Sequence, residues 1–320
     1  MHFGMTTMTR GPLATRSGYM AIAQASERAG LRFISVNDHV VVPSDIASRY
    51  PYSEEGTWAG AGSGFCFDQL ATLSFLAGCT TSLRLLTAVM VVPHRHPVLT
   101  AKMLATADVL SEGRVIVGCG AGWMKEEFDL LGAPYAGRGR ATDEYIRSFK
   151  ALWTEDKPAF AGEFARFDNV MFEPKPVQKP HPPIWIGGES DAAMKRVVRL
   201  GDAWFPGTNN PANRLDTPAR LGQAIAKLRG MAEQAGRDPA GIDLAFTVQW
   251  PVAWTADKAT DGSRRMFTGS AADMAEDAAA LAKLGVHHVA LQLGADTVAE
   301  TCDRIQRFGE DLESVMTKAS

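Results

Sequence analysis

Short apolar runs alternate with helix-like segments along nearly the whole chain, and this alternation constrains the fold most. The apolar runs are rich in β-branched residues, which is typical of strands buried on both faces. They are Phe3–Met5, Phe33–Val36, Leu83–Met90, Val115–Gly118, Ile184–Ile186, Ala203–Phe205, Leu244–Val248 and Val289–Leu293. We expect helices at Ser17–Ala29, Phe67–Gly78, Val98–Leu110, Arg140–Trp153, Asp191–Leu200, Pro211–Ala235, Ala271–Leu284 and Val298–Met316, with a short additional helix over Met124–Leu131.

Eight strand–helix units in succession predict a parallel sheet that closes into a (β/α)8 TIM barrel. The 320 residues are enough for one such barrel with insertions, so we expect a single domain over residues 1–320. An open, doubly wound sheet is the alternative. We expect an insertion at Val40–Gly64, after the second strand, and another at Thr154–Pro183, before the fifth. The alternating sequence PAFAGEFARF in the second insertion predicts a small hairpin.

Composition excludes several classes of partner. The net charge is −3 and no basic stripe is present, which argues against nucleic acid. None of the four cysteines forms a C-x-x-C pair, so a structural zinc or a disulfide framework is not expected. The chain has neither a signal-peptide pattern at its start nor an apolar run that could span a bilayer. We therefore expect a cytoplasmic protein without a membrane partner.

The functional site of a barrel lies where strands end and helices begin. Asp38 and His39 directly follow the second strand, and Asp38 could orient the imidazole of His39 for proton transfer. Alternatively, Asp38 braces the rim of the barrel. The pair His94-x-His96 suggests a metal site, but no histidine or carboxylate completes it at the later strand ends. We therefore prefer a helix-entry loop, with Pro97 in the first helical turn.

Glycines mark two further strand ends. Gly118 and Gly120 fit the start of a dinucleotide-binding fingerprint, but Trp123 occupies the place of its last glycine, which argues against that reading.

The fifth strand ends in Gly187-Gly188-Glu189-Ser190, where glycines would let the backbone approach a ligand and Ser190 could cap a helix. The start of that helix could bind a phosphate. Glu189 and Asp191 would repel the anion, so backbone and hydroxyl donors must dominate. Ordinary turn chemistry is the alternative.

Several stretches resemble the luciferase-like monooxygenase family, and more closely its deazaflavin (F420)-dependent oxidoreductases. They include GLRFISVNDHVVVP, SRYPYS, LRLLTAVMVVPHRHPVLTAKMLATADVLSEGRVIVGCGAGWMKEEFDLLG, RGRATDEYIRSFKALWTED, FEPKPVQKPHPPIWIGGESDAAMKRVVRLGDAWFP and GSAADMAEDAAALAKLGVHHVAL. The similarity is specific from about Gly30 to Pro206 and weak from Gly207 to Gln249. The family fold is a (β/α)8 barrel, which agrees with the alternation.

The resemblance implies a role for each matching residue. Asp38 and His39 match the family's acidic residue and histidine at the cofactor ring, with His39 as the catalytic proton donor or acceptor. The peptide bond Ala88–Val89 matches a cis bond in a bulge that backs the ring. The residues beside the ring would be Ala121, Gly122 and Trp123, and the cofactor phosphate would contact Gly187, Gly188, Glu189 and Ser190. Some sugar-phosphate-oxidising members carry Glu where this chain has Trp123, which argues against that substrate class.

We therefore expect an F420-dependent oxidoreductase that transfers a hydride between C5 of the deazaflavin and a small organic substrate. The substrate would lie under the insertion Val40–Gly64, between apolar walls made by Tyr50, Tyr52 and Trp58. The alternatives are an FMN-dependent monooxygenase that uses O2 and a partner reductase, a flavin- or deazaflavin-binding protein without turnover, and a metal hydrolase. The family resemblance also suggests a homodimer.

Overall fold

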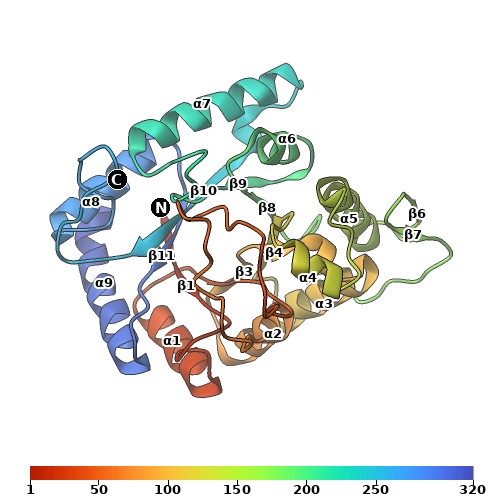
Figure 1. The fold of residues 1–320 in the computed structure, drawn as a ribbon, viewed down its shortest axis with the longest axis horizontal. Coiled ribbons are helices and arrows are strands. Elements are labelled where there is room, and N and C mark those ends of the chain that lie inside the picture. The colour runs from red at the N-terminus through yellow and green to blue at the C-terminus, as the bar shows by residue number, and fades with distance from the viewer. Residues whose placement is uncertain (320) are drawn as a thin grey trace.

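Eight parallel strand positions form a closed ring in the computed structural model, which describes the backbone of residues 1–319 and the side chains of residues 1–311 (Figure 1). Each strand pairs with the next and the last pairs with the first, and pairing of β3 with β5 completes the ring. The strands are β1 (His2–Thr7), β2 (Phe33–Val36), β3 (Arg84–Thr87) continued by β4 (Met90–Val91), β5 (Val115–Gly120), β8 (Ile184–Gly187), β9 (Ala203–Phe205), β10 (Asp243–Pro251) and β11 (His288–Gln292). The predicted TIM barrel is confirmed, and the open sheet is wrong.

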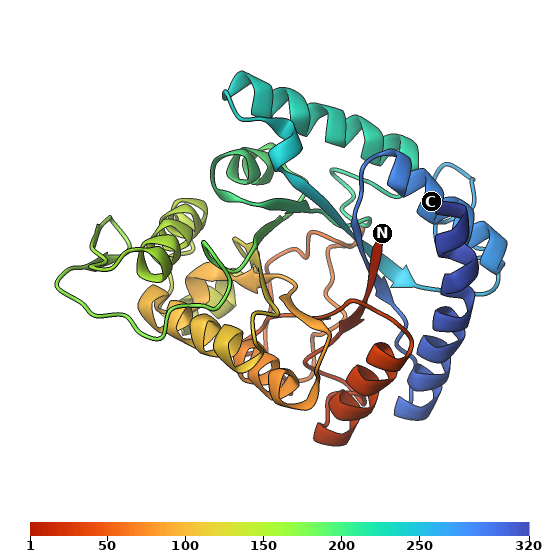
Figure 2. The same cartoon turned by 180° about the vertical axis from the view of Figure 1, so that it is seen from behind.

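Helices cover the outside of this ring, as Figures 1 and 2 show from opposite sides. One boundary differs clearly from the prediction, because α7 begins at Pro218 rather than at Pro211. Both prolines could start a helix, but Thr217 accepts a hydrogen bond from the backbone N–H of Arg220 and so caps the helix there. The helices are α1 (Arg16–Arg28), α2 (Gln69–Cys79), α3 (Pro97–Leu110), α4 (Lys125–Leu130), α5 (Arg138–Thr154), α6 (Asp191–Leu200), α7 (Pro218–Gln234), α8 (Ala271–Lys283) and α9 (Val298–Ala319).

The inside of the barrel is packed with side chains rather than open. Large residues from five strands are combined with alanines from β9, β10 and β11: Phe33, Leu86, Ile116, Trp185, Phe205, Ala203, Ala245 and Ala290. Gly4 of β1 leaves room for the Phe33 ring, since a Cβ there would lie 2.3 Å from it. This apolar plug supports whatever binds at the open ends of the strands.

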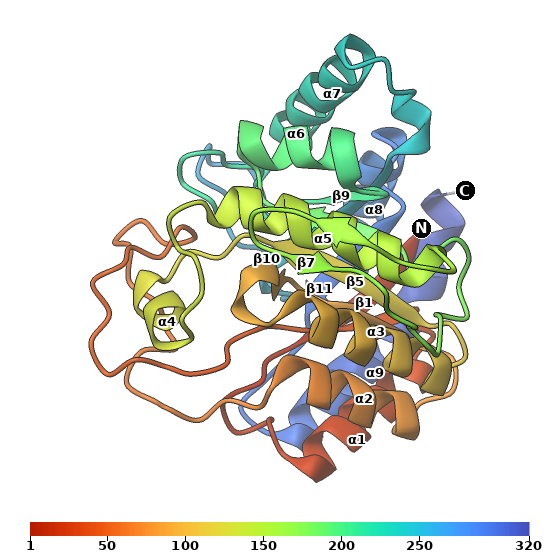
Figure 3. The same ribbon diagram turned by 90° about the vertical axis from the view of Figure 1, so that its right-hand side faces the viewer.

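The two insertions lie in different places. Residues 40–64 lie beside α4 at the end of the barrel where the strands finish (Figure 3). The second insertion forms the predicted antiparallel hairpin, β6 (Phe160–Ala161) and β7 (Arg166–Phe167), on the outside of α5 (Figure 1). In the described part of the chain, no helix combines the length and the apolar character needed to cross a bilayer.

Candidate active site

His39 follows β2 at the barrel mouth, and a buried carboxylate from α4 contacts it. The Nδ1 atom of His39 lies 2.8 Å from Oε2 of Glu127, whose side chain is fully buried. Burial by itself would raise the pKa of Glu127, but the hydrogen bond and charge of His39, the charge of His94 and the N–H of Val40 hold that pKa below its ordinary value. Glu127 is therefore ionised at neutral pH.

Asp38 makes no side-chain hydrogen bond to His39 in the described structure, and Glu127 takes the place at the imidazole that we expected for Asp38. Its two carboxylate oxygens accept hydrogen bonds from the Arg95 guanidinium at 2.8 and 2.9 Å, and Oδ2 also accepts one from the N–H of Val91 at 2.9 Å. Arg95 also bonds Asp68 at 2.7 Å. Burial lowers the pKa of Arg95, but these two carboxylates raise it above its usual value. The alternative role, bracing the barrel rim, is the one that Asp38 has.

The peptide bond Ala88–Val89 is cis, as the resemblance implied, and it lies in a bulge between β3 and β4. Ala88 and Val89 pack on top of the barrel's inner plug and remain partly exposed, so they form part of the floor of the mouth. The methyl groups of Val89 occupy the space that side chains at two neighbouring glycines would fill. A Cβ on Gly120 or on Gly187 would lie 2.6 or 2.7 Å from them. Gly187 therefore makes room for Val89, whereas we expected it to make room for a ligand.

Aromatic rings of the first insertion gather over His39. The ring of Trp58 lies 4.4 Å from that of His39 and 6.1 Å from that of Trp123, and Tyr50 lies 5.1 Å from Trp123. Tyr52 is placed differently, because it packs on Tyr50 and its pKa is raised by burial and by the nearby Glu189 carboxylate. Tyr50, Trp58 and Trp123 therefore form one cluster of rings beside His39, and Tyr52 contacts this cluster through Tyr50.

The other predicted rim residues, Ala121 and Gly122, follow β5 and are partly exposed at the mouth. Gly122 has a φ of +79°, and a Cβ there would lie 2.6 Å from Phe128 and from Val91. Only glycine fits that combination of conformation and close packing. Ala121, Gly122 and Trp123 therefore lie on the same rim as the Ala88–Val89 bulge.

The segment after β8 begins helix α6 with Ser190 as its cap, as predicted. The Ser190 hydroxyl accepts a hydrogen bond from the N–H of Ala193, and Gly188 has a φ of +102°. Glu189 is buried and accepts hydrogen bonds from the N–H of Gly207 at 2.7 Å and from Asn210 at 2.8 Å. Burial raises the pKa of Glu189 in spite of these bonds.

Asp191, the other carboxylate that we expected to repel an anion, pairs with Lys227 at 2.5 Å. Glu189 bonds a different loop and Asp191 has a cationic partner, so the repulsion expected at the start of α6 is weakened.

Arg138, at the start of α5, is a candidate that the sequence reasoning missed. Its Nε donates to the carbonyl of Gly122 at 3.2 Å, and its guanidinium lies over the Tyr135 ring. It has no carboxylate partner within the described part of the chain. A bond from Arg196 to the carbonyl of Gly139 joins the start of α5 to the middle of α6. Arg138 is thus a cation on the same rim as Gly122.

His94 ends a short 3-10 turn, Val92–His94, and His96 precedes α3. Pro97 begins α3 as predicted. His94 is buried at 4.6 Å from the Phe128 ring, with both ring nitrogens lacking a hydrogen-bond partner. No group of three or more His, Cys, Asp or Glu residues suited to a metal ion occurs among the residues the structure describes.

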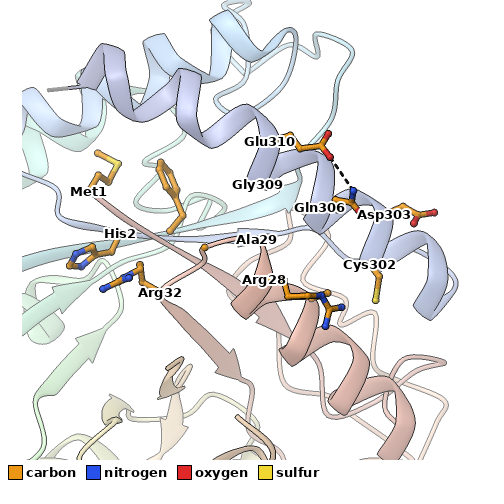
Figure 4. Close-up of a pocket in the computed structure, with 13 residues that line it drawn as sticks. Met1, His2, Arg28, Ala29, Arg32, Cys302, Asp303, Gln306, Gly309 and Glu310 are labelled. Carbon is orange, nitrogen blue, oxygen red and sulfur yellow. Dashed lines mark hydrogen bonds between the residues drawn. The ribbon is translucent and has the colours of Figure 1, made fainter. Parts of the chain in front are cut away.

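Two cavities lie away from His39. One of about 190 Å³ lies between the first insertion and the loops after β9 and β10, and Tyr52, Arg214 and Trp250 are among its lining residues. The other, of about 1080 Å³, lies between α1 and α9, beside the starts of β1 and β2 (Figure 4). Because the second cavity is at the opposite end of the strands, it is separate from the candidate active site.

The sequence profile described as "Luciferase-like monooxygenase" matches residues 1–309, and the chain belongs to that family. An uncharacterised protein of Mycobacterium tuberculosis (strain ATCC 25618 / H37Rv) is 30% identical over 281 residues, which are 88% of this chain and 95% of that protein. The FMNH2-dependent dimethylsulfone monooxygenase of Pseudomonas putida is 36% identical over 174 residues, 52% of this chain and 48% of the relative. The structure of an F420-dependent secondary alcohol dehydrogenase in complex with an F420–acetone adduct superimposes with a TM-score of 0.74 at 19% identity, covering 98% of each chain.

Proposed function

We propose that this protein is an F420-dependent oxidoreductase that transfers a hydride between C5 of the deazaflavin and a small organic substrate. The observation that carries the proposal is the position of His39. Its imidazole is fixed by the buried carboxylate of Glu127, and it lies on the same rim of the barrel as the Ala88–Val89 bulge. When bound, the deazaflavin would supply a ring carbon that accepts or gives up a hydride, while the protein supplies placement and a proton partner.

The residues at the mouth fit such a cofactor. Ala88 and Val89 offer an apolar, partly exposed surface for a planar ring. The anionic tail would be held at the start of α6 by the backbone N–H groups there and by Ser190, as helix N-termini commonly bind phosphate. Arg138 supplies a positive charge without a carboxylate partner among the described residues. His39 would exchange a proton with the substrate, and Tyr50, Trp58 and Trp123 would limit access of water.

The second candidate is an FMN-dependent monooxygenase that needs O2 and a partner reductase. The identity of 36% to the FMNH2-dependent dimethylsulfone monooxygenase over half of this chain supports it. FMN shares a tricyclic ring and a ribityl phosphate with F420, so the same residues at the mouth would serve both cofactors. The structural likeness to the F420-dependent alcohol dehydrogenase shows the fold alone and does not separate the two.

Parallel titrations of the apoprotein with F420 and with reduced and oxidised FMN test the proposal. We expect F420 to bind the more tightly, as measured by quenching of its fluorescence and by calorimetry. Tighter binding of reduced FMN, together with oxygen consumption when a flavin reductase is added, would favour the monooxygenase. Tight binding of either cofactor with no turnover across a panel of substrates would favour a binding protein.

A further inference from the structure

Glu127 contacts both His39 and the start of the first insertion. Its Oε2 lies 2.8 Å from Nδ1 of His39, and its Oε1 accepts hydrogen bonds from the N–H groups of Val40 at 2.7 Å and Val41 at 3.2 Å. The side chain is fully buried. Both carboxylate oxygens are therefore used as acceptors in a place that water does not reach.

These partners leave one arrangement of protons on a neutral His39. An ionised carboxylate has no hydrogen to donate, so the hydrogen between Glu127 and His39 belongs to Nδ1. The other ring nitrogen, Nε2, then carries a lone pair and no hydrogen. Nε2 has no hydrogen-bond partner in the described part of the chain and is the nitrogen left for a ligand.

The neighbouring titratable groups do not replace Glu127 in this role. Nδ1 of His94 lies 3.9 Å from Oε1 of Glu127, too far for a hydrogen bond, and burial keeps the pKa of His94 below its ordinary value. Asp38 is paired with Arg95. Burial and the nearby carboxylates raise the pKa of the Cys66 thiol, which therefore stays neutral.

We infer that Glu127 is the positioning residue that holds His39 in the Nδ1–H form, so that Nε2 presents its lone pair to the substrate as a proton acceptor. A substrate O–H or N–H would give its proton to Nε2, the bonding electrons would stay on the substrate, and His39 would become an imidazolium with both nitrogens protonated. The same carboxylate bonds Val40 and Val41, so one side chain holds both the imidazole of His39 and the start of the first insertion. This use of His39 rests on the proposed function.

Glu126 provides a matched control. Its Oε1 accepts hydrogen bonds from the N–H groups of Ala47 and Ser48 at 2.9 and 3.1 Å, so it also anchors the first insertion. No hydrogen bond joins it to His39. In Glu127→Gln, the amide oxygen can keep the bonds from Val40 and Val41, which turns the amide N–H toward Nδ1 of His39 and favours the reversed form with hydrogen on Nε2. Glu126→Gln loosens the same insertion without this effect.

The test is ¹⁵N NMR of the histidine rings in the apoprotein, with His39→Asn used to identify the His39 signals among the seven histidines. At a pH where His39 is neutral, we expect wild type and Glu126→Gln to show a protonated Nδ1 and an unprotonated Nε2, and Glu127→Gln to show the reverse. A wild-type His39 with its hydrogen on Nε2, or a Glu127→Gln spectrum like the wild type, overturns the inference. The wild-type spectrum decides the tautomer even where a variant fails to fold.

This experiment is independent of the proposed function because no coenzyme is present. If His39 has the expected tautomer but the protein binds neither F420 nor FMN, the proposed function is contradicted. The inference that Glu127 fixes the tautomer of His39 is not. A protein that binds F420 with the opposite tautomer contradicts the inference alone. Glu127→Asp should recover the wild-type tautomer in part, since it restores an acceptor at a greater distance from His39.

Discussion

Arg95 bonds both carboxylate oxygens of Asp38 through two parallel hydrogen bonds, and only a tenth of the Arg95 side chain is exposed. Removing one partner of a buried ion pair costs about 3–5 kcal/mol, because the other charge stays buried. Arg95 would keep its bond to Asp68, so we expect Asp38→Ala to lower the free energy of unfolding by at most that amount, as measured by urea denaturation.

The control for that variant is Asp129→Ala. Asp129 pairs with Lys125 where both side chains are more than half exposed, so its removal should have little effect on the free energy of unfolding. Equal losses in the two variants would mean that the Arg95–Asp38 pair is no stronger than a surface pair.

His39→Ala should slow turnover by roughly 10²- to 10⁴-fold, the usual range for removal of a general acid or base. The dissociation constant of the cofactor should change only a few-fold, because the tail would be held at α6. Steady-state kinetics and a cofactor titration on the same preparation measure both effects. His96→Ala, at an exposed position without a side-chain hydrogen bond in the described structure, is the control. If turnover of His39→Ala equals that of wild type, His39 has no role in proton transfer.

Ser190→Asp tests the phosphate site without removing the helix cap, since Asp and Ser cap helices about equally well. The new charge should weaken cofactor binding by roughly 10- to 100-fold, as expected for two like charges near a protein surface. Thr15→Asp makes a comparable change at the cap of α1, which follows β1 on the opposite side of the ring from β8, and should weaken binding far less. Undiminished affinity in Ser190→Asp would place the anionic tail elsewhere.

Gly187→Ala should destabilise the protein by about 1–3 kcal/mol through overpacking against Val89. In Val89→Ala/Gly187→Ala the clashing methyl groups are gone, and the next atom near the new Cβ is the carbonyl oxygen of Cys119 at 3.6 Å. The double variant should therefore lose less stability than the two single variants added together. Thermal unfolding of all four proteins measures this coupling, and strict additivity would show that Val89 does not fill the space beside Gly187.

Asp243 should contribute to stability in a defined range of pH. Burial would raise its pKa, but hydrogen bonds from His288 and His287 lower it from 3.8 to about 2. A carboxyl group with a depressed pKa stabilises the folded state above its unfolded pKa, and this contribution is lost as the pH falls toward 2. The difference in unfolding free energy between wild type and Asp243→Asn should thus shrink as the pH falls from about 4 toward 2. A difference that grows over that range would reverse this assignment.

The barrel and many local features of the site could be predicted because they depend on local patterns. The alternation of apolar runs and helices predicts eight strand positions. The predicted bounds of α6, Asp191–Leu200, are confirmed, because Ser190 caps the helix at its start. The run Leu83–Met90, expected as one strand, is divided into β3 and β4, which both pair with β5.

The partners of His39 and Asp38 could not be predicted, because they come from distant parts of the chain. Glu127 is 88 residues away from His39, in an acidic stretch, Glu126-Glu127, that is typical of the exposed start of a helix. Asp38 and His39 are adjacent in sequence, but successive side chains of an extended segment point to opposite sides. Arg95 lies between His94 and His96, and the H-x-H pattern points to a metal site rather than to an ion pair between Arg95 and Asp38.

The first insertion is joined to α4 largely through its main-chain N–H groups. Glu126 and Glu127 each accept hydrogen bonds from two of them. Every amino acid except proline offers such a group, so these bonds do not depend on the side chains at Val40, Val41 and Ala47. The Ser48 hydroxyl adds one bond of its own, which it accepts from the N–H of Lys125. Relatives could replace the aromatic rings of this loop one at a time, and thereby alter what the mouth accepts, without having to evolve a new anchor.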